Sequence, residues 1–234
     1  MKRWLCLVMG GLLGSGAAAA REGDTIQPYA SLSMTYDSNL LRLADNETDQ
    51  NFGTGERSDV ATTLAAGLNV NLEFSRQVVK LALARSTTRL DRFSRLDYDG
   101  QDLRLDWSWR VGNQVAGGVG ASRVVTQTQV NDLLSVFVTG RQSTVNNLLT
   151  RDRLYANVEW SLHPRWRLAA GVTRLESSND QLIQRSVDSE EDVADARVTY
   201  RTPKGSQLSA QIVRREVRYP FRSARVQINQ YEQT

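Results

Sequence analysis

Apolar and polar residues alternate almost everywhere along the chain after its first twenty residues. In the segment 60–74, Leu68 and Leu72 fall in one phase, and Asn69 and Asn71 fall in the other. Because successive side chains of a β-strand point to opposite faces of the sheet, this pattern predicts a strand with one apolar and one polar face. The same alternation predicts further strands at 30–36, 79–85, 102–111, 115–125, 153–162, 166–174, 194–201 and 208–212, with another beginning near Val226. We therefore expect an all-β chain with nine strands and the start of a tenth.

The connections between these segments alternate between short and long. Short turns are expected at 75–77, 112–114, 163–165 and 203–206, and longer polar segments at 37–58, 88–100, 126–147, 176–192 and 218–225. Tight turns at one end and long loops at the other are the topology of an antiparallel transmembrane outer-membrane β-barrel, whose short turns face the periplasm. The alternation of the connections therefore favours such a barrel.

Aromatic residues gather beside the short turns. Each one falls in the apolar phase of its strand, and the set is Phe74, Trp109, Trp160, Trp166 and Tyr200. Aromatic rings prefer the membrane–water interface, so a barrel carries an aromatic girdle at that level. A soluble β-sandwich or jelly roll, which is the alternative fold, accounts for the strand alternation but poorly for the loop asymmetry and the girdle.

The first twenty residues have the pattern of a secretory signal peptide. Lys2 and Arg3 form a basic start, Leu5 to Leu13 form a short apolar core, and Ala18 to Ala20 provide small residues for cleavage. The apolar run is too short for a membrane-spanning helix. Residues 21–234 are then the barrel domain, which we expect to be incomplete at its C-terminal end, because bacterial barrels close with an even number of strands.

Removal of the leader changes the charge and the cysteine content of the chain. The Lys and Arg residues fall from 29 to 27 against 26 acidic residues, which leaves a net charge of +1 and gives little support for a nucleic-acid partner. Cys6 lies within the leader, so a mature chain has no cysteine for a disulfide framework.

The polar phase of the predicted strands carries many charges of both signs. The residues that we expect to line a lumen are Arg104, Asp106, Arg110, Arg153, Glu159, Asp195, Arg197 and Arg201. Mixed charges around a hydrated lumen suit a channel for a polar solute such as a saccharide. The alternative is that these charges only solvate and brace the barrel wall.

Catalytic and metal sites are not expected. His163 is the sole histidine and falls in a predicted short turn, away from an outer-rim or lumen serine that a triad needs, and one histidine without cysteine disfavours zinc. Asp97 and Asp99 could act as a carboxylate pair, but on a loop they are expected to be solvated. The acidic stretch 45–51 in the first loop lacks the glycine of a calcium-binding EF-hand. We expect neither an enzyme nor a cofactor.

Two loop motifs carry a family resemblance. The first, YDSNLLRL, starts at Tyr36 and includes Asp37, Ser38 and Asn39. The second, DRFSRLDYDG, starts at Asp91 and includes Arg92, Phe93, Asp97 and Tyr98. With the leader and the strand layout, they make most of the mature chain similar to the EpsL-type outer-membrane proteins of exosortase- and PEP-CTERM-associated exopolysaccharide operons.

The resemblance implies a barrel in the outer membrane, surrounded by its lipid, with a role in making or exporting an extracellular polysaccharide together with other export components. It brings no catalytic residues. Asp and Asn at strand ends readily form Asx-turns, so the motif residues are expected to order the outer loops. The alternative function is a structural or interaction barrel without an open channel.

Overall fold

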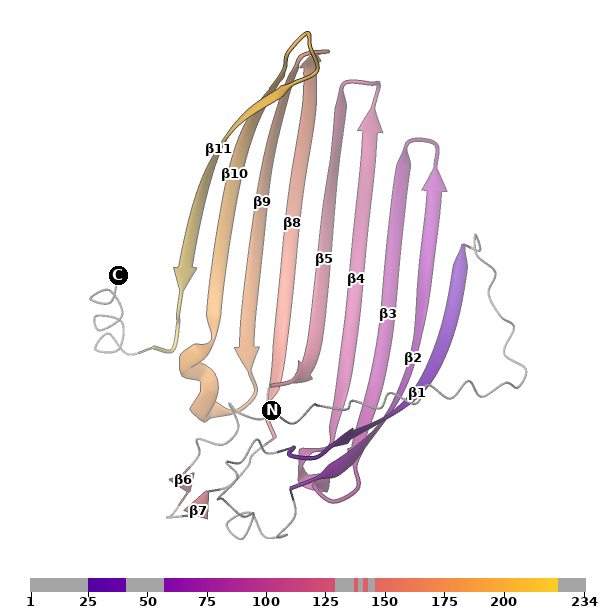
Figure 1. Ribbon diagram of the computed structural model, residues 1–234, viewed down its shortest axis with the longest axis vertical. Coiled ribbons are helices and arrows are strands. Elements are labelled where there is room, and N and C mark those ends of the chain that lie inside the picture. Colours follow the sequence, from indigo (N-terminus) through magenta and orange to yellow (C-terminus); the bar gives the residue numbers. More distant parts are fainter. Residues whose placement is uncertain (1–24, 41–56, 129–136, 139–140, 143–145, 223–234) are drawn as a thin grey trace.

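The computed structural model describes residues 25–40, 57–128, 137–138, 141–142 and 146–222. Nine strands form one antiparallel sheet in the order β1-β2-β3-β4-β5-β8-β9-β10-β11, which follows the chain except that β6 and β7 form a separate hairpin (Figure 1). The strands are β1 (Ile26–Asp37), β2 (Asp59–Phe74), β3 (Gln77–Leu90), β4 (Tyr98–Val111), β5 (Val115–Gln127), β8 (Leu148–His163), β9 (Trp166–Asn179), β10 (Ser189–Arg201) and β11 (Gln207–Arg218). The predicted all-β, antiparallel architecture is confirmed, and the nine described strands form an open sheet.

Each of the nine predicted strands lies inside an observed one, but the observed strands extend further toward the long connections. β3 continues to Leu90 and β4 already begins at Tyr98, so the connection between them is shorter than the predicted segment 88–100. Threonines such as Thr87 and Thr88 favour strands. However, both faces carry polar residues at these strand ends, so the sequence shows no alternation of apolar and polar residues there. A two-stranded hairpin of β6 (Phe137–Val138) and β7 (Arg141–Gln142) was not predicted.

The short turns meet at one end of the sheet and the long connections at the other, which Figure 1 shows as its top and bottom. Two short turns contain glycines in the left-handed region, Gly112 with a φ of 58° and Gly205 with a φ of 89°, which L-residues with a side chain rarely adopt. Two short 3₁₀ helices, η2 (Ser94–Leu96) and η3 (Leu182–Val187), lie in the long connections. The predicted segregation of turns and loops is therefore correct for the described chain.

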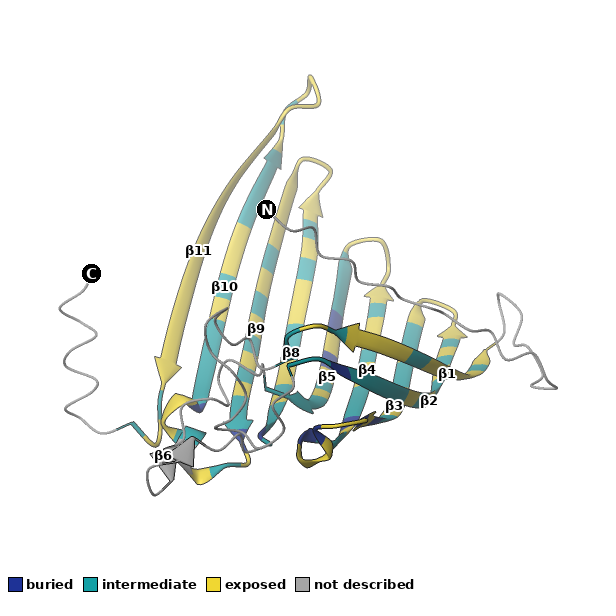
Figure 2. Cartoon of the chain, turned by 60° about the horizontal axis from the view of Figure 1, so that its bottom comes forward, coloured by how far each residue is buried: buried dark blue, intermediate teal, exposed yellow. Residues whose placement is uncertain are grey.

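The sheet has almost no hydrophobic core. Among the described residues, the buried hydrophobic side chains are Leu90, Phe93 and Leu96, all at the long-loop end. Figure 2 shows most strands as a mixture of half-buried and exposed residues and β11 as exposed throughout, without one buried layer. No helix in the described part of the chain is long and apolar enough to cross a membrane.

Three predicted features lie outside the described residues: the signal peptide, the strand near Val226 and the acidic stretch of the first loop. Within the described residues, β1 and β11 are the two edges of the sheet.

Candidate functional site: the two faces of the sheet

Strand register joins the apolar phases of the nine strands into one continuous face. Leu83 of β3 lies opposite Leu68 of β2 and Leu103 of β4, and residues directly opposite each other share a face. The side chains on this face stay open to the surroundings: Leu154 is 60% exposed and Ile212 is 73% exposed. A soluble monomer rarely leaves so wide an apolar surface uncovered. We call it the apolar face.

All five predicted girdle residues lie on the apolar face at the short-turn end. Phe74, Trp160 and Trp166 are each about half exposed, at 58%, 47% and 46%. The rings of Trp166 and Tyr200 pack against each other with centroids 4.7 Å apart. Trp109 covers Gly117 on the next strand, where a Cβ atom would lie only 2.5 Å from the indole ring. The aromatic rings therefore form a border along one edge of the apolar face.

Charged residues form a second border on the apolar face, at the long-loop end. On every second strand the border carries an arginine, and these are Arg85, Arg123, Arg174 and Arg214 on β3, β5, β9 and β11. Opposite the first three lie Gln101, Asp152 and Asp192. Arg123 Nε is 2.7 Å from an Asp152 carboxylate oxygen. This charged border was not predicted from the sequence, although its residues lie in the apolar phase of their strands.

The charged border crosses the strands obliquely. Arg85, for example, shares a row of paired residues with Val125 of β5, and Arg123 lies two residues nearer the short turn than Val125. The same shift of two residues separates Arg174 from Arg123 and Arg214 from Arg174. A step of two residues at about 3.4 Å each, over two strand spacings of about 4.8 Å, corresponds to an inclination of about 35°. Strands of outer-membrane barrels tilt by about 35–45° from the membrane normal, so the slope is that of a line parallel to the membrane plane.

The two borders run parallel. Eight residues along the strand separate Asp152 from Trp160, and the same number separates Trp166 from Arg174 and Asp192 from Tyr200. Eight residues cover about 27 Å of strand, or about 22 Å along the normal of a membrane crossed at 35°. The apolar band of outer-membrane barrels is about 25 Å tall. The apolar face thus has the height and the two borders of a surface that crosses a bilayer.

The opposite face carries the charges that were predicted to line a lumen. Arg104 is bound by Asp102 on its own strand, with nitrogen and oxygen 2.8 Å apart, and Glu159 lies 3.4 Å from Arg167. Asp195 accepts a hydrogen bond of 3.3 Å from Gln211. The phase assignment of the predicted set is consistent with the register, since all its members share this face, which we call the polar face.

Only part of the predicted set comes together. Arg104 and Arg153 lie in one row across β4, β5 and β8, and Asp106 lies in the adjacent row opposite Gly120 and, beyond it, Tyr155. The Tyr155 hydroxyl donates a hydrogen bond to the Asp106 carboxylate, and the Arg153 guanidinium lies 5.1 Å from the Tyr155 ring centroid.

Tyr155 was not predicted as a site residue. The glycine at position 120 of the paired strand could have indicated it, because Gly120 leaves the space in which the Tyr155 ring lies.

The remaining predicted residues of the polar face are dispersed. Arg197 lies opposite Ala169 and Gln211, whereas Arg201 and Arg110 lie near the short turns. His163 ends β8, and its Nδ1 accepts a hydrogen bond of 3.2 Å from the backbone N–H of Arg165. Within the described residues, no group of three His, Cys, Asp or Glu side chains is placed to hold a metal ion.

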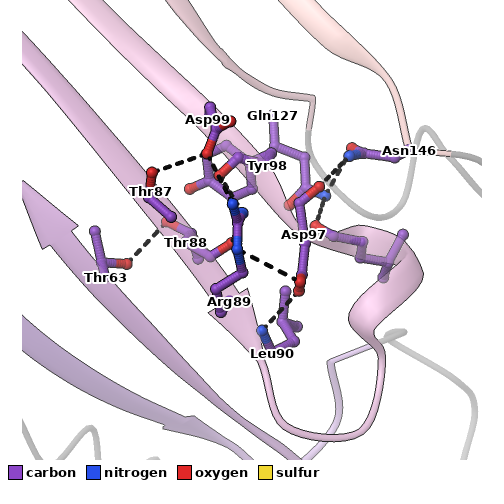
Figure 3. Close-up of polar contacts among 11 residues, drawn as sticks. Thr63, Thr87, Thr88, Arg89, Leu90, Asp97, Tyr98, Asp99, Gln127 and Asn146 are labelled. Carbon is purple, nitrogen blue, oxygen red and sulfur yellow. Dashed lines mark hydrogen bonds and ion pairs between the residues drawn. The ribbon is translucent and has the colours of Figure 1, made fainter.

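The second loop motif builds the base of the connection between β3 and β4. Asp97 accepts a hydrogen bond of 2.8 Å from the backbone N–H of Leu90, and Asp99 lies 3.2 Å from Arg89 (Figure 3). The side chain of Asn146 donates to the backbone carbonyl of Asp97 from across the long-loop end. Arg89 also donates to the carbonyl of Tyr98. These contacts tie the loop to the sheet.

Asp59, outside both motifs, anchors the same loop. Its buried carboxylate accepts the backbone N–H groups of Arg92 at 3.2 Å and Phe93 at 2.9 Å, and the Phe93 ring is 1% exposed. In the first motif, the Asp37 carboxylate accepts the backbone N–H of Asn39 at 2.9 Å, while Ser38 is exposed in the turn. The predicted Asx-turn is present, and the loop motifs have a structural role in the described region.

The fold and the two faces define a class of protein: an all-β chain whose antiparallel up-and-down sheet has one apolar and one charged face. No protein-family model matches the chain, and no curated protein matches it. Among solved structures, the chain is similar to Pseudomonas aeruginosa OpdQ, with 13% sequence identity and a TM-score of 0.40. The alignment covers 92% of this chain and 58% of OpdQ, so the chain spans less than two thirds of that protein.

Proposed function

We propose that this chain forms the wall of an outer-membrane β-barrel and that its polar face lines a passage for a polar solute. The observation that carries the proposal is the pair of parallel borders on the exposed apolar face, one aromatic and one charged, about 22 Å apart along the membrane normal. A sandwich partner would also cover an apolar face, but it does not require two borders that keep a constant separation across tilted strands.

The chemistry of the polar face supports a hydrated passage. Arg104 and Asp106 of β4 and Arg153 of β8 are grouped across β5, and the charge of Arg104 is paired with Asp102. Such a wall offers hydrogen-bond donors and acceptors side by side, which suits the hydroxyl groups of a saccharide better than an ion of one sign.

The role in exopolysaccharide biosynthesis or export rests on the resemblance of the two loop motifs. The motif residues shape the long-loop end, where Phe93 and Leu96 are buried and Asp97 is held by backbone contacts. Catalysis is not part of the proposal, since the described residues of both motifs hold the loops together.

A second candidate is a structural or interaction barrel without an open passage. The observation that favours it is the hydrogen-bonded long-loop end, where Asn147 is fully buried and its side-chain amide donates to Asn179 and Gln184. An ordered loop end of this kind offers a stable surface to other envelope components.

Cell fractionation of the full-length gene product tests the proposal first. We expect the product in the outer-membrane fraction, with an electrophoretic mobility that changes on boiling because a closed barrel resists detergent until it is heated. A soluble periplasmic product without a mobility shift would refute the membrane assignment and favour a secreted β-sandwich.

Planar-bilayer conductance and a clean gene deletion then separate the two candidates. Open-channel conductance and a loss of secreted polysaccharide in the deletion strain support the passage. A heat-modifiable protein without conductance, together with normal polysaccharide, supports the structural barrel.

A further inference from the structure

The charged border of the apolar face contains a highly exposed arginine, Arg214. Arg214 projects from β11 on the apolar face, opposite Ala194, and its side chain is 84% exposed. Its recorded ion-pair partner is Glu216, at 3.7 Å, but Arg218 binds the same carboxylate more closely, at 2.9 Å. Arg214 is therefore a cation at the membrane border whose charge is only weakly compensated by the described residues.

A groove on the apolar face leads to this arginine. It has a volume of about 600 Å³ and contains Leu154, Ala156, Val172 and Ala194, with Arg174, Asp192, Arg214 and Glu216 among its lining residues. A second groove of about 690 Å³ lies nearer the short turns and is lined mainly by apolar side chains, among them Trp160, Leu168, Val198 and Ile212. Small side chains at Ala170, Ala196 and Ala210 help to form it.

The acidic residues at the border are mostly engaged within the chain. Arg218 lies 3.5 Å from Asp192 and also binds Glu216, and Arg174 lies 3.3 Å from Glu190. The acidic groups beside the groove are thereby partly neutralised, whereas Arg214 still presents its guanidinium outward. A guanidinium forms paired charge-assisted hydrogen bonds with phosphate oxygens, which makes an anionic phosphate the complementary group.

We propose that the β8–β11 part of the apolar face binds a phosphorylated lipid of the outer leaflet, with its acyl chains in the two grooves and a phosphate on Arg214 and Arg174. The order of the site along the strands fits such a molecule, since the apolar grooves lie between the aromatic border and the arginines. The proposed occupant is lipid A, the phosphorylated lipid anchor of lipopolysaccharide, because the arginines lie at the long-loop end, which faces the outside in outer-membrane barrels. This inference rests on the membrane location proposed above.

Lipid binding by the full-length protein, extracted in mild detergent, tests the proposal. The probes are lipid A with two phosphates, lipid A with one phosphate, and zwitterionic phosphatidylcholine, each added to the micelles and followed by native mass spectrometry. We expect the doubly phosphorylated lipid to bind most tightly, and the double variant Arg174→Gln/Arg214→Gln to weaken that binding by at least about tenfold, the loss expected for charge-assisted hydrogen bonds.

The matched control is Arg215→Gln. Arg215 adjoins Arg214 but lies on the polar face, where it binds Glu191 at 2.7 Å. This control should leave lipid binding unchanged. Equal affinities for the three probes, an unchanged double variant, or an equal loss in the control would overturn the proposal, as would burial of Arg214 between two copies of the chain in crosslinking.

The heat-shift assay keeps this test separate from that of the proposed function. Variants that remain heat-modifiable in the outer membrane but show no phosphate preference refute only the lipid site. A wild-type protein that is soluble and shows no heat shift refutes the membrane assignment, and the lipid site with it.

Discussion

An arginine placed halfway between the two borders should be costly on one face of β8 and tolerated on the other. Ala156 lies on the apolar face, four residues from Asp152 and four from Trp160, which puts it at the middle of the proposed membrane band. Asn157 is the next residue and lies exposed on the polar face. The pair Ala156→Arg and Asn157→Arg thus adds the same charge at nearly the same depth on opposite faces.

The expected magnitudes follow from the depth of the residue. An arginine on the lipid side of a barrel costs about 2–4 kcal/mol at the bilayer midplane and about 0–1 kcal/mol near the interfaces. Ala156→Arg should therefore lower the folding equilibrium constant by about 30- to 700-fold, since each 1.4 kcal/mol is a factor of ten. Asn157→Arg should change it by less than about fivefold, because a hydrated face solvates the added charge.

The assay is reversible folding of the full-length protein into lipid vesicles, titrated with urea and followed by the heat-modifiable band and by tryptophan fluorescence. Leu162→Arg, beyond the aromatic border on the same strand, provides a depth control with an expected cost of about 0–1 kcal/mol. Equal costs for Ala156→Arg and Asn157→Arg, or a larger cost for Asn157→Arg, would refute the assignment of the two faces.

Three further predictions concern other parts of the sheet. Asp59→Ala should lower the free energy of unfolding by about 1–3 kcal/mol in urea titrations, because the backbone N–H groups of Val60, Arg92 and Phe93 lose their carboxylate acceptor, whereas the exposed Asp91→Ala should have little effect. Gly120→Val should destabilise the sheet or displace Tyr155, since a Cβ would lie 2.4 Å from its ring; an unchanged urea midpoint and an unchanged Tyr155 environment would contradict this packing. Asp106→Asn should shift the ion selectivity of an open channel toward anions in bilayer reversal-potential measurements, while Asp192→Asn on the apolar face should leave it unchanged.

The sequence predicts most of this fold because the side-chain period of a strand is two. Segments such as 60–74 and 102–111 alternate cleanly, and each becomes a strand of the described sheet. The ends of β3 and β4 were missed because Thr87 and Asp99 place polar groups on the apolar face, while Thr88 places one on the polar face. Alternation does not reveal strands whose two faces have similar chemistry.

The candidate site was predicted less completely because it depends on register. The aromatic border could be found from each strand alone, since every ring lies a few residues from its own turn. The charged border requires knowing that Arg123 lies opposite Asp152 and that Arg174 lies opposite Asp192, which depends on the register of each strand pair. The grouping of Asp106 with Tyr155 depends in the same way on a strand 49 residues away.

The inclination of the borders also sets the width of any wall built from these strands. At about 35° and a spacing of about 4.8 Å, each strand takes up about 6 Å of circumference, so nine strands contribute about 53 Å. A ring of that girth would measure about 17 Å between opposite backbones, and inward side chains such as Arg153 and Arg197 would occupy most of that width. A passage wide enough for a hydrated sugar chain therefore requires more wall than these nine strands provide, and the two edges at β1 and β11 are where additional strands would join.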